Sequence, residues 1–175
     1  MDRKSPFDIM AQLGSLRRYA RVLTRNDADV EDLVQDALLR AHERRDSFRK
    51  GGDLRLWLMS ILHNAFIDGA RARRAERQRE TAAARLAPQA LAAPQEDVVR
   101  LAQIRAAFFR LPEDQRAALH LVAIEGLSYP EAAKVLGVPQ GTLMSRLARA
   151  RAALRAFEDG APHLKLVGGR DDAAG

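Results

Sequence analysis

Cysteine is absent from the 175-residue sequence, which excludes disulfide bonds, thiolate metal sites and thiol nucleophiles together. Long apolar runs are also absent, since no stretch approaches the roughly 18 residues that a membrane-spanning helix needs. The charged start of the chain, Met1 to Phe7, has no apolar stretch behind it and lacks the pattern of a signal peptide. These absences predict a soluble, unprocessed chain with no membrane insertion, and the lack of cysteine is compatible with the cytoplasmic location that we expect.

Recognisable catalytic and ligand-binding motifs are missing as well. The four histidines have no metal-ligand spacing and no accompanying cluster of carboxylates, so we interpret them as surface or core residues. They are His42, His63, His120 and His163. No glycine-rich phosphate loop and no nucleophile motif occurs. The sequence therefore predicts no enzymatic activity, no catalytic residues, no cofactor and no metal.

Charge is present in excess and is unevenly placed. The formal net charge is +6 at pH 7, which favours a polyanionic partner, although an ordinary solvated arginine-rich surface gives the same total. The distribution separates these interpretations. Acidic residues gather at 31–43, whereas arginines gather at 71–79 and 146–155. An acidic face suits docking on a protein, and basic faces suit phosphates.

Apolar residues recur at helical spacing in the first half of the chain. The predicted helices lie near residues 13–23, 30–41 and 54–66, and the last runs into the arginine-rich stretch. Asp27 or Asp29 is the expected N-cap of the second helix, and Asp53 that of the third, after a polar loop at 46–53. Trp57 lies on an apolar stripe, so burial in the core is favoured over stacking on an unpaired base.

The stretch from 81 to 95 is alanine-rich, contains two prolines and has no sustained apolar face, so we interpret it as a flexible linker. Extended, some twenty residues reach roughly 65–70 Å, about two turns of duplex DNA. No strand pattern occurs in the sequence. We therefore expect an all-α fold with two small helical domains. Their predicted bounds are 8–80 and 96–160, with 81–95 as linker and 161–175 as a disordered tail.

The second predicted domain contains the pattern of a helix-turn-helix. Ser128 and Glu131 form a capping-box pattern at the start of a short helix, and Gly137 stands where a left-handed residue ends it. The longer helix that follows, from 140 to 157, carries no carboxylate. A helix in the major groove needs donors for bases and phosphates, so we expect this one to bind DNA rather than to serve only for packing.

Several segments carry a resemblance to a known family. They are DLVQDALLRA at 32–41, LRLWL at 54–58, LPEDQR at 111–116, EGLSY at 125–129 and GTLMSR at 141–146. In these segments the chain resembles the sigma-70 family in its small group IV form, the extracytoplasmic-function sigma factors. The resemblance covers about residues 10 to 157 and involves two separate motif sets in the right order.

The resemblance implies a transcription initiation factor rather than an enzyme. Such a factor binds core RNA polymerase and promoter DNA, recognises a single-stranded −10 element and a duplex −35 element, and is controlled by an anti-sigma factor. The expected polymerase-binding residues are Gln35, Asp36, Leu39 and Arg40, on the face of the second helix away from its apolar stripe. The expected −10 contacts are Lys50, Asn64, Arg71, Arg73 and Arg74.

The expected −35 contacts lie on the second helix of the helix-turn-helix. They are Thr142, Ser145, Arg146, Arg149, Arg151 and Arg155. We expect Arg146 to read a guanine and Arg149 to take either a base or a phosphate. Arg151 and Arg155 are expected to hold the DNA backbone, which positions the helix without specifying sequence.

Two other classes of protein share parts of this pattern. A DNA-binding regulator of a different class would use the first half for dimerisation or ligand sensing, and would bind duplex DNA tightly without polymerase. A pure interaction protein would use both halves as docking surfaces and would lack salt-dependent affinity for DNA. An enzyme is the most distant alternative, because no site can be assembled from these residues.

Overall fold

The computed structural model of the chain describes residues 8–24, 26–49, 51–77 and 96–160, and helices are the only regular elements in these ranges. The elements are η1 (Met10–Gln12), α1 (Leu13–Thr24), α2 (Asp27–Glu43), η2 (Arg45–Ser47), α3 (Leu54–Arg77), α4 (Glu96–Arg110), α5 (Glu113–Ala123), α6 (Tyr129–Leu136) and α7 (Gln140–Gly160). The prediction of an all-α fold is confirmed. The segments predicted as linker and tail, 81–95 and 161–175, lie outside the described residues.

Polar side chains cap the helices of the first half. Asn26 is extended, and its side chain accepts a hydrogen bond at 3.1 Å from a backbone NH in the first turn, so it is the N-cap of α2. The prediction of Asp27 or Asp29 as that N-cap is wrong. Both aspartates lie inside the first turn, where their charge favours the positive end of the helix. Asp53 accepts a hydrogen bond at 3.0 Å from the first turn of α3, which confirms its predicted cap.

Helices α6 and α7 form the predicted helix-turn-helix. The carboxylate of Glu131 accepts a hydrogen bond from the backbone NH of Ser128 at 2.8 Å, and the reciprocal bond completes the capping box. Gly137 ends α6 in the left-handed region at φ 62°. Helix α5 ends at Ala123, and the turn that follows it contains Gly126 at φ 68°.

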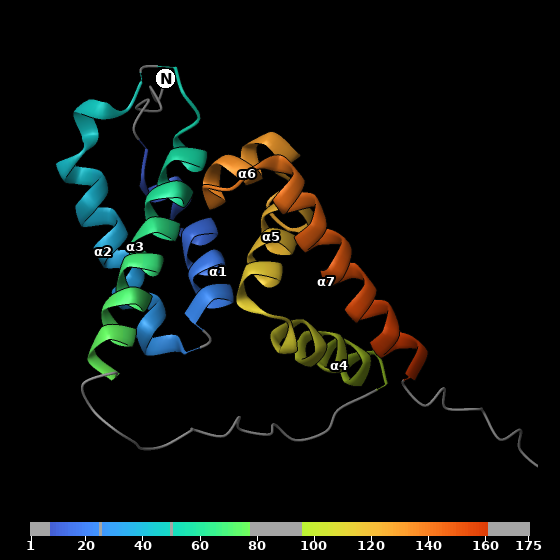
Figure 1. Ribbon diagram of the computed structural model, residues 1–175. Coiled ribbons are helices and arrows are strands. Elements are labelled where there is room, and N and C mark those ends of the chain that lie inside the picture. The colour runs from blue at the N-terminus through green and yellow to red at the C-terminus, as the bar shows by residue number, and fades with distance from the viewer. Residues whose placement is uncertain (1–7, 25, 50, 78–95, 161–175) are drawn as a thin grey trace, which may run out of the picture.

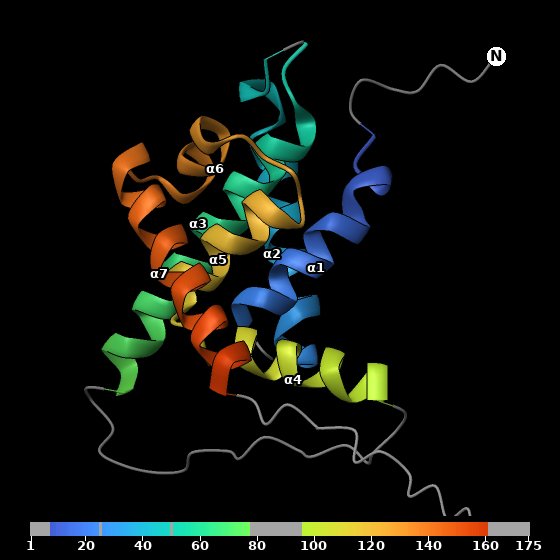
Figure 2. The same ribbon diagram turned by 90° about the vertical axis from the view of Figure 1, so that its right-hand side faces the viewer.

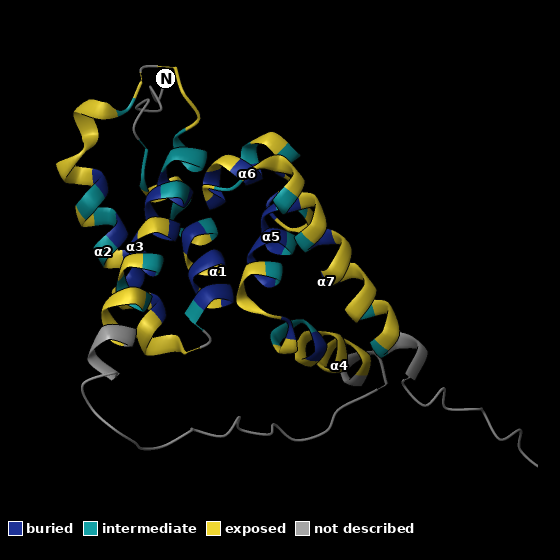
Figure 3. Ribbon diagram, in the orientation of Figure 1, coloured by how far each residue is buried: buried dark blue, intermediate teal, exposed yellow. Residues whose placement is uncertain are grey.

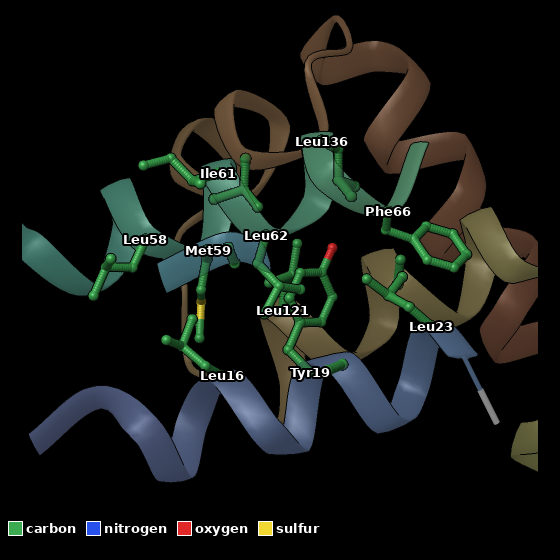
Figure 4. Close-up of a cluster of buried hydrophobic side chains, with 14 of the residues drawn as sticks. Leu16, Tyr19, Leu23, Leu58, Met59, Ile61, Leu62, Phe66, Leu121 and Leu136 are labelled. Atoms are coloured by element: carbon green, nitrogen blue, oxygen red, sulfur yellow. The ribbon is translucent and has the colours of Figure 1, made fainter. Parts of the chain in front are cut away.

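The two halves of the chain pack against each other (Figure 1). Helix α5 lies on α1, and α6 lies on α3. The buried apolar residues of α1, α2, α3, α5, α6 and α7 form one continuous cluster. Figure 4 shows Leu121 and Leu136, from the second half, among Tyr19 and Leu62 of the first half. The halves therefore share a core instead of each burying a separate one.

Helix α4 is the most peripheral helix of the second half. In Figure 2 it runs along the bottom of the molecule and crosses the C-terminal part of α7. Figure 3 shows α1 and α5 largely buried at the centre, whereas the outer faces of α2 and α7 are exposed. Surfaces for partners are therefore available on α2 and α7 without any change in the core.

The shared core predicts that the two halves unfold together. Leu121 is fully buried, and Leu121→Ala is expected to lower the free energy of unfolding by about 2–5 kcal/mol. Chemical denaturation followed by circular dichroism should show one transition, shifted to lower denaturant. Leu39→Ala, at a position 59% exposed on α2, is the control and should change the stability by less than about 0.5 kcal/mol. Two resolved transitions would contradict the shared core.

Candidate nucleic-acid and polymerase interface

Helix α7 presents a polar face to solvent. Leu143, Leu147 and Ala150 are buried against the rest of the second half. Because residues lie about 100° apart around a helix, Ser145 and Arg149 project on the opposite side, and both are exposed. No carboxylate lies on this helix before residue 158. The exposed face can therefore approach DNA without charge repulsion.

The other predicted −35 residues lie on the flanks of α7. Arg146 is 23% exposed, and its Nε lies 3.1 Å from Oδ2 of Asp114 on α5. On the opposite flank, Arg151 and Arg155 line a groove of about 300 Å³ between α7 and α4. Thr142 is half-buried in the first turn. The six predicted residues thus lie on one helix but point in three directions.

Helix α3 carries the described part of the predicted −10 set. Asn64 is exposed, as are Arg71 and Arg73 further along the helix. Lys50 and the side chain of Arg74 lie outside the described residues. The structure therefore brings an amide and two guanidinium groups to the surface of one helix.

Trp57 stands at the beginning of α3, beside the preceding loop. Its side chain is half-buried, and its ring lies 5.2 Å from that of Phe48 in a tilted arrangement. An added Cβ on Gly52 would lie 3.1 Å from the carbonyl oxygen of Arg49, so this loop turns tightly. Trp57 therefore packs against the core, in the predicted direction, but it stays partly exposed instead of lying within the core.

A cleft of about 540 Å³ separates the two halves on one side of the molecule. Asn64 and Arg146 both line it. The first half also contributes Asp68 and Arg71, and the second half contributes Asp114. Two residues expected to contact different promoter elements therefore face one space, which carries charges of both signs.

The predicted polymerase-binding residues lie together on the outer side of α2. Gln35 and Leu39 are exposed. Arg40 is held in place, because its Nε donates to Asp36 at 3.1 Å and its Nη1 donates to Asp68 of α3 at 2.7 Å. This face thus combines an apolar side chain with a fixed ion-pair network.

A buried polar cluster between the halves escapes prediction from the sequence. The hydroxyl of Tyr19 and Nδ1 of His63 are hydrogen-bonded at 2.9 Å, and the Tyr19 ring stacks on that of His120 with 5.6 Å between centroids. Burial, with a further contribution from Arg146, lowers the pKa of His63 to about 4. Burial also lowers the pKa of His120. In the sequence, only the apolar residues next to Tyr19, His63 and His120 indicate that these side chains are buried.

Glu125 adjoins this cluster in the turn after α5, and its side chain is 0% exposed. Its carboxylate lies 3.1 Å from Arg18 of α1 and 3.4 Å from Arg55 of α3. Arg55 also donates to the backbone carbonyl of Glu125 at 2.9 Å. Nε2 of His120 is 3.3 Å from the same carboxylate. The carboxylate of Glu125, in the second half, thus forms ion pairs with two arginines of the first half.

The remaining histidines stand apart from this cluster. His42 is exposed on α2, and His163 lies outside the described residues. Within the described ranges, no His, Asp or Glu side chains are grouped closely enough to hold a metal ion. None of the helices in these ranges is long and apolar enough to cross a membrane.

Two family profiles match the chain in sequence. The profile of sigma-70 region 2 matches residues 9–76, and the profile of sigma-70 region 4 matches residues 101–154. The ECF RNA polymerase sigma factor EcfG of Rhodopseudomonas palustris (strain TIE-1) is 42% identical over 157 residues, which cover 88% of this chain and 86% of that protein. The ECF sigma factor SigM of Mycobacterium tuberculosis is 39% identical over 149 residues, covering 79% and 69%.

Solved sigma factors also match the chain in structure. The sigma factor RpoE of Bartonella quintana, solved in complex with the anti-sigma factor NepR, matches with a TM-score of 0.73 and 33% identity, over 88% of this chain and 96% of that one. CnrH, solved in complex with the cytosolic domain of CnrY, matches with a TM-score of 0.62 and 30% identity, over 91% of each chain. Both matches extend across the two halves.

The buried histidine on α3 predicts that acid destabilises the fold. Because the pKa of His63 falls from 6.5 to about 4, its neutral form stabilises the fold above pH 6.5, and this contribution is lost as the pH falls towards 4. At about pH 5 the loss is about 2 kcal/mol. Thermal unfolding midpoints measured from about pH 7.5 to about pH 5 should therefore fall.

Two glutamine variants separate this effect from general acid denaturation. His63→Gln keeps a polar partner for Tyr19 and should make the midpoint less dependent on pH, while the buried His120 keeps part of that dependence. His42→Gln, on the exposed side of α2, should leave that dependence unchanged. A His63→Gln protein with the wild-type pH dependence would show that His63 is not the titrating group.

Proposed function

This chain belongs to the sigma-70 family of RNA polymerase initiation factors, in its extracytoplasmic-function branch, and on that premise we propose that it directs core polymerase to specific promoters. It is not an enzyme, since the polymerase adds the nucleotides. The observation that carries the proposal is the helix-turn-helix, whose second helix turns an acid-free face to solvent. The amide and arginines on α3 supply a second nucleic-acid surface in the other half.

We infer that the first half holds the −10 element as a single strand. Melted DNA exposes base edges that a duplex hides, and flipping a base out costs a few kcal/mol. The Asn64 amide offers both donors and acceptors to such an edge. Arg71 and Arg73 suit the phosphates of the same strand. Lys50 and Arg74 remain predicted contacts of this element.

We infer that the second half reads the −35 element as duplex DNA through α7. Arg149 projects outward beside Ser145, so it can enter the major groove and bond a guanine with two donors. Arg146 can do the same only by leaving Asp114, because that carboxylate holds its Nε at 3.1 Å. We therefore assign the first base contact to Arg149 and a second one, made after release from Asp114, to Arg146.

The other −35 residues suit the DNA backbone. Thr142 stands in the first turn of α7, where the helix N-terminus favours a phosphate. Arg151 and Arg155, on the flank towards α4, are proposed to hold phosphates at the edge of the groove. Contacts of this kind increase affinity for every sequence alike.

We propose that an anti-sigma factor controls this chain. The support is the match to the sigma factor RpoE, which was solved in complex with the anti-sigma factor NepR and is covered over 96% of its length. A partner of that kind would cover the polymerase-binding or DNA-binding surfaces described above. Because promoter DNA and core polymerase are the other partners, we infer that the chain acts in the cytoplasm.

Run-off transcription tests the proposed function directly. Core polymerase with this chain should transcribe a subset of a genomic promoter library, and polymerase alone should not. Asp36→Arg reverses a charge on the outer side of α2 and should lower polymerase binding. Because it also removes the ion pair with Arg40, it should lower the free energy of unfolding by about 1 kcal/mol and leave the protein folded. The control is Glu31→Arg, which alters an exposed pair with Arg17 and should change stability by at most about 1 kcal/mol.

Two results would contradict these proposals. Unchanged polymerase affinity after replacing Gln35, Asp36, Leu39 and Arg40 together would refute the docking surface on α2. A stable dimer that binds duplex DNA tightly without polymerase would indicate a DNA-binding regulator instead.

The −35 contacts predict two different kinds of mutational effect. Arg149→Ala should relax selectivity at one base pair, a loss of about 1–3 kcal/mol of discrimination. Arg155→Ala should weaken all sequences alike and reduce the dependence of affinity on salt. Binding of the holoenzyme to a panel of −35 variants at two salt concentrations distinguishes them. A uniform loss from Arg149→Ala, with sequence preference intact, would reassign that residue to a phosphate.

A further inference from the structure

An exposed methionine lies near the beginning of α7, and none of the DNA contacts assigned above involves it. Met144 is 50% exposed in the second turn of the helix, next to the fully buried Leu143. We propose that Met144 determines −35 specificity by contacting the C5-methyl group of a thymine in the major groove. This inference rests on the proposed function and deepens it, because it adds an apolar contact to the hydrogen bonds assigned to the arginines.

Met144 begins one flank of α7 whose other end is basic. Ala148, Arg151 and Arg155 follow it on the same side of the helix, and all of them are exposed. Helix α4 crosses the C-terminal part of α7 (Figure 2) and leaves Met144 open to solvent. The second helix of a helix-turn-helix presents its N-terminal residues to the base edges. The apolar end of this flank therefore lies where bases are read, and the basic end lies where phosphates are held.

The polar side chains next to Met144 already form bonds within the protein. The hydroxyl of Ser145 donates to the backbone carbonyl of Thr142 at 2.9 Å, so its one O–H donor is occupied. Nε of Arg146 lies 3.1 Å from the carboxylate of Asp114. A base contact by either donor must replace one of these bonds. A contact with the thioether of Met144 breaks none, so the first two turns of α7 are best prepared for an apolar group on the DNA.

The chemistry of the major groove determines which group an apolar side chain contacts there. All four bases present hydrogen-bonding atoms in this groove, and thymine alone adds a methyl group. Methionine is unbranched and has three rotatable bonds, so its thioether adapts to the shape of such a group. Removing one methyl group from water increases affinity by about fourfold. Met144 thus favours an A·T pair in one orientation over the other three base pairs.

Met144 and Arg149 should contact different base pairs. They lie about 7.5 Å apart along the helix axis, at about 1.5 Å per residue. Successive base pairs are stacked about 3.4 Å apart. The thymine should therefore lie roughly two base pairs from the guanine assigned to Arg149. This spacing separates the two contacts in any scan of the −35 element.

Deoxyuridine tests the contact, because it differs from thymidine by the methyl group alone. In a promoter that the holoenzyme transcribes, each thymine of the −35 element, on either strand, is replaced in turn by deoxyuridine. The unmodified holoenzyme should lose about three- to fivefold in affinity at one of these positions. Holoenzyme with Met144→Gln should bind the two templates equally at that position, because the amide gains nothing from the methyl group.

Two further variants serve as controls. Met10→Gln makes the same change at another exposed methionine, in the first half, and should keep the full response to the methyl group. Met144→Leu retains an apolar side chain and should keep most of that response. Met144→Gln should also leave the dependence of affinity on salt unchanged, because it removes no phosphate contact. Circular dichroism verifies that each variant is folded.

Each possible failure has a distinct meaning. A −35 element at which the unmodified holoenzyme binds thymine and deoxyuridine equally at every position overturns the methyl contact. A response to the methyl group that persists in Met144→Gln overturns the role of Met144, because another residue then makes the contact. In both cases the holoenzyme still selects its promoter, so the proposed function stands. A holoenzyme whose affinity ignores every base change in the −35 element refutes the proposed function, and the methyl contact with it.

Discussion

Packing of α5 against α1 is the contact on which the rest of the arrangement depends. It places Leu121 in a core built mainly by the first half. The same contact carries Glu125 to the two arginines of α1 and α3 and sets α6 against α3. Once α6 lies there, the start of α7 follows, and the cleft between Asn64 and Arg146 is formed. The positions of both predicted DNA-binding surfaces thus follow from one helix pair.

The polar groups within this contact give it a different character from an ordinary core. Apolar burial supplies most of the attraction, and it is indifferent to small changes in register. A buried ion pair adds little net stability, because desolvation offsets the attraction, but leaving one partner unpaired is costly. The cluster around Glu125 therefore favours one docking geometry strongly over its neighbours.

The sequence predicts the local parts of this structure well, because those parts depend on near neighbours. Apolar spacing locates the helices, and the caps at Asp53 and Ser128 and the turn at Gly137 are decided within a few residues. Contacts between the halves depend instead on residues that are far apart in the sequence. Arg18 and Glu125 lie 107 positions apart, and no periodic pattern indicates which buried or charged group faces which. The ion pair between Arg146 and Asp114 cannot be predicted from the sequence for the same reason.

The three directions taken by the arginines of α7 leave them unequally available to DNA. The outward face with Arg149 is exposed, so duplex DNA can reach that side chain without rearrangement. Arg146 instead borders a cleft that also carries Asp68 and Asp114, and carboxylates repel a phosphate backbone. Its Nε is held at 3.1 Å by Asp114, so a DNA contact by Arg146 must replace that ion pair. The predicted −35 residues of one helix therefore differ in what their contact with DNA costs.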